Sequence, residues 1–109
     1  MAINYHVLGQ SNPTGGTLTA AYTVPAATQT IVSTIAICNQ AATATTFTIA
    51  VQVNGASLSA SQYVNYQTPL PGNDTVTLTI GMTLNAGDVI SVQTPSTTVS
   101  FNIFGSEIS

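Results

Sequence analysis

The feature that most constrains the fold is an alternation of apolar and polar residues with a period of two. In TFTIAVQV (46–53) every second residue is apolar: Phe47, Ile49, Val51 and Val53. The residues between them are Thr46, Thr48, Ala50 and Gln52. In TVTLTI (75–80) Val76, Leu78 and Ile80 alternate with threonines. Because successive side chains of a strand point to opposite faces, both stretches are predicted to be strands with an apolar inner face and a polar outer face.

Further strands are predicted from similar patterns at 17–24, 30–38, 62–67, 88–93 and 98–104. The segment INYHVL (3–8) also alternates, and we expect an edge strand or an arm laid on a neighbouring molecule. Turn residues separate these stretches, as in NPTGG, PLPGND and NAGD. Turn signals roughly every 8–12 residues are typical of an all-β sandwich or barrel. We therefore predict an all-β fold, an antiparallel two-sheet β-sandwich, jelly-roll-like, with seven to eight short strands.

A chain of 109 residues is long enough for one modest core. We expect an N-terminal arm or edge strand over residues 1–16 and a β-sandwich domain over residues 17–109. The N-terminus lacks the charged and apolar regions of a signal peptide, and short apolar runs argue against a membrane helix. We expect synthesis in a cytoplasm and release, if any, by a route other than secretion.

The chain has no lysine or arginine, three acidic residues and one histidine, giving a net charge of −3. Nucleic-acid binding depends on cations that neutralise phosphates, and anionic membranes attract the same groups, so neither partner is expected. Only 3% of the residues are charged, against about 25% in ordinary soluble domains. Since a lone soluble protein generally keeps charges on its surface, the composition indicates either a surface buried against neighbouring molecules or one kept soluble by hydroxyls and amides alone.

The few groups capable of chemistry are scattered along the sequence: His6, Cys38, Asp74, Asp88 and Glu107. A catalytic carboxylate needs a second titratable group nearby, placed so that the pKa values of the two groups differ, and a metal ion needs several ligands. Asp in NAGD and in PGND is typical of turns, where its carboxylate accepts hydrogen bonds from nearby backbone amides. We predict no catalytic residue, no metal site and no cofactor.

A glycan-binding module remains an alternative because Tyr63 and Tyr66 lie close to Asn65 and Gln67. Aromatic rings and amides together are the usual groups of a sugar-binding face. In a regular strand, however, residues 63 and 66 point to opposite faces. The alternation therefore predicts that the two tyrosines do not share one platform.

Several stretches resemble known families. L-x-x-G-D-x-I-x-V (84–92) is also found in trimeric jelly rolls of the complement-C1q and tumour-necrosis-factor type. A longer set, covering about residues 20–108, is similar to small virion structural proteins of tailed bacteriophages, prominent among phages of cyanobacteria. Its most specific parts are the NDTVTLTIG stretch and the terminal FNIFGSEI, and its other parts are YTVPAAT, VSTIAICNQ, FTIAV and AGDVISV.

The resemblance implies a β-sandwich subunit of a virion, most simply a capsid decoration (cement) protein that stabilises the shell as a homo-oligomer, with a trimer as the implied state. The implied partners are copies of itself and the major capsid protein or another virion protein, and the alternative is a tail, baseplate or neck component. Relatives tend to carry Arg or Lys where Gln40 and Gln52 stand here, so contacts would depend on hydrogen bonds and apolar surface. The expected contact residues are Ile3, Tyr5, His6, Val7, Phe104, Glu107 and Ile108.

Overall fold

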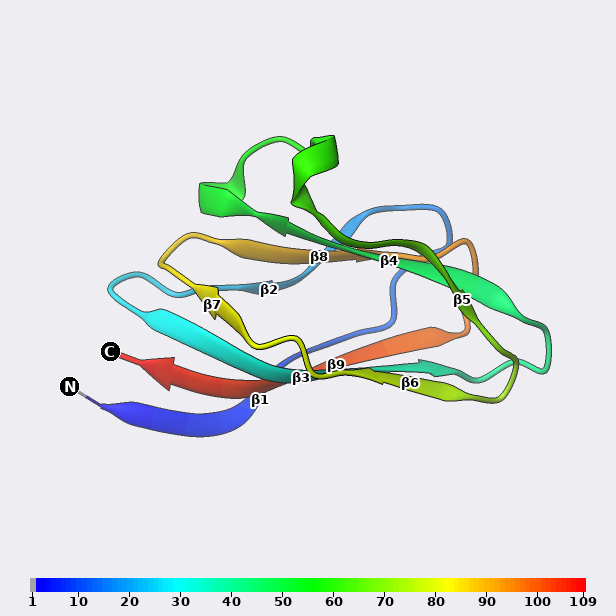
Figure 1. Cartoon of the computed structure of the whole chain (residues 1–109), viewed down its shortest axis with the longest axis horizontal. Coiled ribbons are helices and arrows are strands. Elements are labelled where there is room, and N and C mark those ends of the chain that lie inside the picture. Colours follow the sequence, from blue (N-terminus) through cyan, green and yellow to red (C-terminus); the bar gives the residue numbers. More distant parts are fainter. Residues whose placement is uncertain (1) are drawn as a thin grey trace.

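The computed structural model describes residues 2–109, which form two antiparallel β-sheets packed face to face (Figure 1). The five-stranded sheet contains β1 (Ile3–Ser11), β9 (Val99–Ile108), β3 (Gln29–Asn39), β6 (Thr75–Leu78) and β7 (Met82–Leu84). The four-stranded sheet contains β2 (Thr19–Thr23), β8 (Val89–Gln93), β4 (Thr45–Gln52) and β5 (Tyr63–Leu70). Two short 3-10 helices, η1 (Val53–Gly55) and η2 (Ala60–Gln62), lie between β4 and β5.

The strand order is that of a jelly roll. The sheets read β1-β9-β3-β6 and β2-β8-β4-β5, with β7 continuing the edge beside β3 after β6. The chain therefore crosses repeatedly from one sheet to the other, as in two interleaved Greek keys. The predicted fold class, an all-β two-sheet sandwich, is confirmed.

The core lies between the sheets and is built from the alternating residues of both. Phe47 of β4 and Phe101 of β9 are fully buried and meet edge to face, with ring centroids 6.5 Å apart. Branched aliphatic residues fill the space around them: Val32, Ile35, Ile37, Ile49, Ile90, Val92, Val99 and Ile103. Because these side chains come from both sheets, their burial holds the two layers together.

The N-terminal segment forms β1, an edge strand that pairs with β9 over nearly its whole length. Residues 12–18 then lead to β2 in the other sheet. Met1, the first residue of the predicted N-terminal segment, lies outside the described residues. Both ends of the described chain lie at the same end of the sandwich, where Ala2 and Ser109 exchange backbone hydrogen bonds (Figure 1).

Two predicted inward-facing residues are in fact exposed. Val53 is 64% exposed because β4 ends at Gln52 and η1 begins, with Asn54 in a left-handed conformation. Ile80 is 46% exposed because β6 ends at Leu78 and the chain turns at Gly81, whose φ is +69°. In each case a break in the strand ends the alternation before the last apolar residue.

The outer face of β4 also differs from the prediction, since Thr48 and Ala50 are buried. The segment of residues 53–62 lies over the four-stranded sheet, on the side away from the five-stranded sheet (Figure 1). The short helix η2 in this segment contacts β4. Among residues 2–109, no helix is long and apolar enough to cross a membrane.

Candidate functional site

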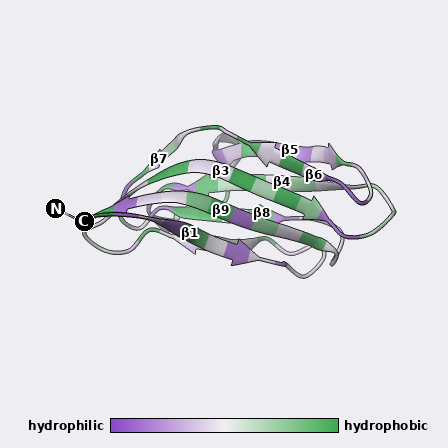
Figure 2. Ribbon diagram, turned by 90° about the horizontal axis from the view of Figure 1, so that it is seen from below, coloured by the Kyte–Doolittle hydropathy of each residue, from purple (hydrophilic) through white to green (hydrophobic). Residues whose placement is uncertain are grey.

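The outer face of the five-stranded sheet carries a group of exposed apolar side chains, here called the apolar face: Ile3, Tyr5, Val7, Ile31 and Phe104. Strand register brings them together, since Val7 lies opposite Phe104 and Tyr5 lies opposite Ser106, which also pairs with Ile31. Tyr5 is 81% exposed. Figure 2 views the molecule from the side of this sheet, with hydrophobic and hydrophilic bands alternating along β3 and β9.

A groove of about 500 Å³ crosses the apolar face. Its walls include Tyr5, Val7, Ile31 and Phe104, and small residues at Gly105 and Ser106 border it between the strands. No acidic residue lines the groove, and His6 is its one titratable lining residue besides Tyr5. Such a surface gains most free energy when it is covered by another apolar surface.

His6 and Glu107, which are predicted together with Tyr5 as contact residues, take part in a chain of hydrogen bonds within the subunit. The Nε2 of His6 donates to a carboxylate oxygen of Glu107 at 2.7 Å, and the hydroxyl of Tyr22 donates to the other oxygen at 2.5 Å. The Tyr22 hydroxyl also lies 2.7 Å from that of Thr30. These four residues, here called the His6–Glu107 clasp, connect β1 and β9 with β2 of the other sheet. Ile108, the remaining predicted contact residue, is half-buried opposite Ile3.

The clasp shifts the ionisation of its members. The hydrogen bond from Tyr22 lowers the pKa of Glu107, and the hydrogen bond from His6 adds to this effect. The hydrogen bond to Glu107 raises the pKa of His6, helped by donation from Nδ1 to the backbone oxygen of Val7. Because both ring nitrogens face oxygen acceptors, the charged imidazolium is favoured. Burial, followed by the bond to Glu107, raises the pKa of Tyr22 to about 12.

Asp88 and Asp74 hold turns, as their sequence context predicts. The carboxylate of buried Asp88 accepts hydrogen bonds from the backbone amides of Asn54 and Asn85, both at 2.9 Å. Exposed Asp74 accepts one from the amide of Thr75 at 2.8 Å. Among residues 2–109, no three His, Cys, Asp or Glu side chains cluster in a way that could hold a metal ion.

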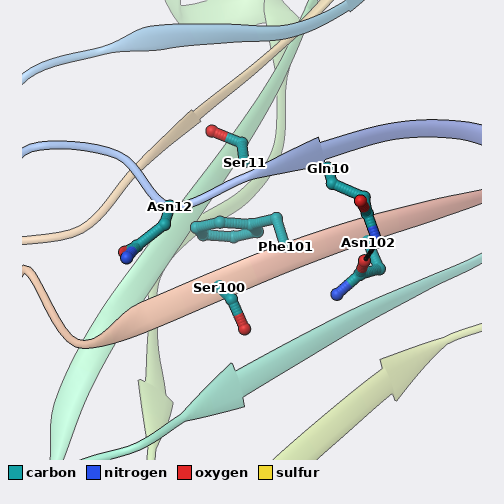
Figure 3. Close-up of a pocket in the computed structure, with 6 residues that line it drawn as sticks. All are labelled: Gln10, Ser11, Asn12, Ser100, Phe101 and Asn102. Atoms are coloured by element: carbon teal, nitrogen blue, oxygen red, sulfur yellow. Dashed lines mark hydrogen bonds between the residues drawn. The ribbon is translucent and has the colours of Figure 1, made fainter.

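A second hollow, of about 290 Å³, lies where β1 ends and β9 begins, away from the paired chain ends Ala2 and Ser109. Figure 3 shows its lining. Its lining is Gln10, Ser11, Asn12, Ser100, Phe101 and Asn102. Gln10 donates to the side-chain oxygen of Asn102 at 2.8 Å. The two serines have no His, Asp or Glu beside them in this lining, so nothing there would activate a hydroxyl as a nucleophile.

The prediction that Tyr63 and Tyr66 point to opposite faces is wrong. Their rings meet edge to face, with centroids 4.8 Å apart and planes at 67°. An irregularity in the β4–β5 register explains this, because the adjacent residues Ile49 and Ala50 pair with Asn65 and Tyr63, which leaves one extra residue between the two tyrosines. This extra residue shifts the alternation by one, so that Tyr63 and Tyr66 lie on the same face. A second irregularity lies between Asn65 and Thr68.

The tyrosine pair borders a cleft of about 260 Å³ on the outer face of the four-stranded sheet, here called the tyrosine cleft. Its other lining residues are polar or small: Gly16, Thr46, Thr48, Gln67, Gln93, Thr94 and Pro95. No sequence signal marks the bulges that create it; Gln67 has a φ of +48°, a conformation that glutamine rarely adopts.

Comparison with known proteins gives no family assignment, since no family model matches the chain and no curated protein matches it significantly.

Proposed function

We propose that this chain is a non-catalytic structural subunit of a phage virion, a capsid decoration protein that reinforces the shell as a homo-oligomer. The observation that carries the proposal is the apolar face of β1, β3 and β9, exposed on a sandwich that has no lysine or arginine. The resemblance of residues 20–108 to small phage virion proteins is the reason for proposing a phage particle as the structure into which the chain assembles.

A second copy of the chain is the partner that best suits the apolar face. The groove presents tyrosine, aliphatic and phenylalanine side chains with no acidic residue. Its one imidazole, His6, is paired with Glu107, so little unbalanced charge opposes the meeting of two copies. Tyr5 and Phe104 are of the aromatic type that forms the energetic centre of interfaces. In addition, β1 has an open edge whose backbone groups can pair with a strand of a neighbour.

Attachment to a shell follows from the same composition. Without cations, contacts with a capsid protein depend on hydrogen bonds from hydroxyls and amides and on apolar area, each of them weak alone. An oligomer presents several copies of such contacts at once, and simultaneous engagement multiplies the affinity. A passive lattice subunit needs no active site. A tail, baseplate or neck position is the alternative, because the same properties suit any symmetric part of a particle.

The test is a comparison of particles made with and without this gene. We expect mass spectrometry of purified particles to contain the protein, cryo-electron microscopy to place it on the outer capsid surface, and gene deletion to lower the temperature at which shells release DNA. Density on the tail would favour the alternative. Absence of the protein from the particle would refute the proposal, and unchanged shell stability would refute the reinforcing role.

A further inference from the structure

The tyrosine cleft has the composition of a binding site for a neutral sugar. It lies on the four-stranded sheet, so it is separate from the apolar face. The side chains of Thr48 and Gln93 face each other in register across β4 and β8, and the bulged strand β5 brings the two tyrosines beside them. We propose that this cleft binds the ring of an uncharged pyranose, free or as one residue of a longer glycan.

The aromatic wall is exposed and held in place. Tyr66 is 62% exposed, whereas Tyr63 is half-buried and contacts the Tyr66 ring edge to face. The face of an aromatic ring is electron-rich, so it attracts the polarised C–H groups that line one side of a pyranose. Because the neighbouring ring restricts Tyr66 before binding, less conformational freedom is lost when a ligand stacks on it.

The polar wall offers hydrogen bonds of the kind that sugar hydroxyls use. The Thr48 hydroxyl oxygen accepts from the backbone amide of Gln67 at 3.0 Å, and its own hydrogen can be donated to a ligand. The side-chain nitrogen of Gln93 donates to the backbone oxygen of Gly16 at 3.1 Å, and both residues line the cleft. Its side-chain oxygen can accept from a ligand hydroxyl.

Charge and size select the class of ligand. The lining of the cleft has no acidic residue and no histidine, and the chain has no lysine or arginine to neutralise a phosphate, sulfate or uronate. A volume of about 260 Å³ lies just under the roughly 300 Å³ at which pockets for drug-sized ligands begin. One neutral sugar ring matches both the uncharged lining and the small volume of the cleft.

The test is a titration of the full-length ¹⁵N-labelled protein with glucose, galactose, mannose and N-acetylglucosamine, followed by neutral oligosaccharides of each. We expect at least one to shift the amide signals of Gly16, Thr48, Gln67 and Gln93, with affinity on the order of 1 mM for a single ring. Glucuronic and galacturonic acid should not. No shift at these amides with any neutral sugar up to tens of millimolar, or equal binding of the uronates, would overturn the proposal.

Variants assign the binding to the cleft. Tyr66→Ala should weaken binding about tenfold through loss of stacking, whereas Tyr66→Phe should retain most of it. Tyr5→Ala, which removes an exposed tyrosine from the other sheet, should leave binding unchanged. Undiminished sugar binding by a folded Tyr66→Ala variant would contradict the assignment. Tyr66→Ala tests sugar binding and Tyr5→Ala tests the proposed assembly face. Failure of sugar binding and failure of assembly are therefore distinguishable.

Discussion

Truncating Tyr5 tests the assembly face with little effect on the fold. Its side chain is 81% exposed, and a tyrosine can bury about 150–250 Å². About 120–200 Å² therefore remains to be covered, which at about 25 cal/mol per Å² is worth about 3–5 kcal/mol as an upper bound. Alanine keeps part of this area, and ordering the side chain costs free energy. We expect Tyr5→Ala to cost about 2–3 kcal/mol of association free energy, in the range of interface hot spots.

This loss corresponds to a dissociation constant about 30- to 140-fold higher. It would be measured by sedimentation velocity over a dilution series, with far-ultraviolet circular dichroism to show that the fold is kept. The matched control is Tyr66→Ala, a tyrosine that is 62% exposed on the opposite sheet, which should leave association unchanged. A folded Tyr5→Ala variant that associates like the parent, or an equal loss in Tyr66→Ala, would refute the assignment of the interface.

Three further predictions concern the fold. Phe47→Ala, which empties a fully buried site between the sheets, should lower the free energy of unfolding in urea by about 3–5 kcal/mol; a loss under about 1 kcal/mol would contradict the packing. Asp88→Ala should cost about 2–4 kcal/mol, because two part-buried backbone amides lose their acceptor, and Asp88→Asn should cost less; equal stability of all three proteins would exclude the turn role. The clasp predicts a stability maximum between about pH 5 and 6.5: the lowered pKa of Glu107 gives stability that is lost as the pH falls, and the raised pKa of His6 gives stability that is lost as the pH rises. Glu107→Gln should flatten this profile, and an unchanged profile would argue against the clasp.

The sequence predicts the sheets well because every second side chain of a half-buried strand faces the core, which produces a period of two in the apolar residues. Phe47 and Ile49 are buried as the alternation requires, and Asp88 holds the turn that its NAGD context indicates. The prediction failed where a strand ended. β4 ends just before Asn54 and β6 ends before Gly81, and both residues have a left-handed backbone. The periodicity within each strand does not predict where the strand ends.

The candidate sites depend on features that lie beyond local patterns. The bond between Tyr22 and Glu107 joins residues 85 apart in the sequence, so it follows from the jelly-roll topology rather than from either neighbourhood. The tyrosine cleft depends on a bulge of β5, opposite Ile49 and Ala50, that brings Tyr63 and Tyr66 to one face. Part of the apolar face could be predicted from the sequence, because Ile3, Tyr5 and Val7 already alternate along the N-terminal strand.

The central claim is that this chain acts as an assembled subunit, and its mass in solution tests that claim most directly. We predict that sedimentation velocity of the purified full-length protein at micromolar concentration will give a trimer or a larger closed oligomer, with an s value that falls on dilution or in the Tyr5→Ala variant. The mass of one chain is 11.1 kDa. A stable species of that mass at every concentration, with the apolar face uncovered, would contradict the account.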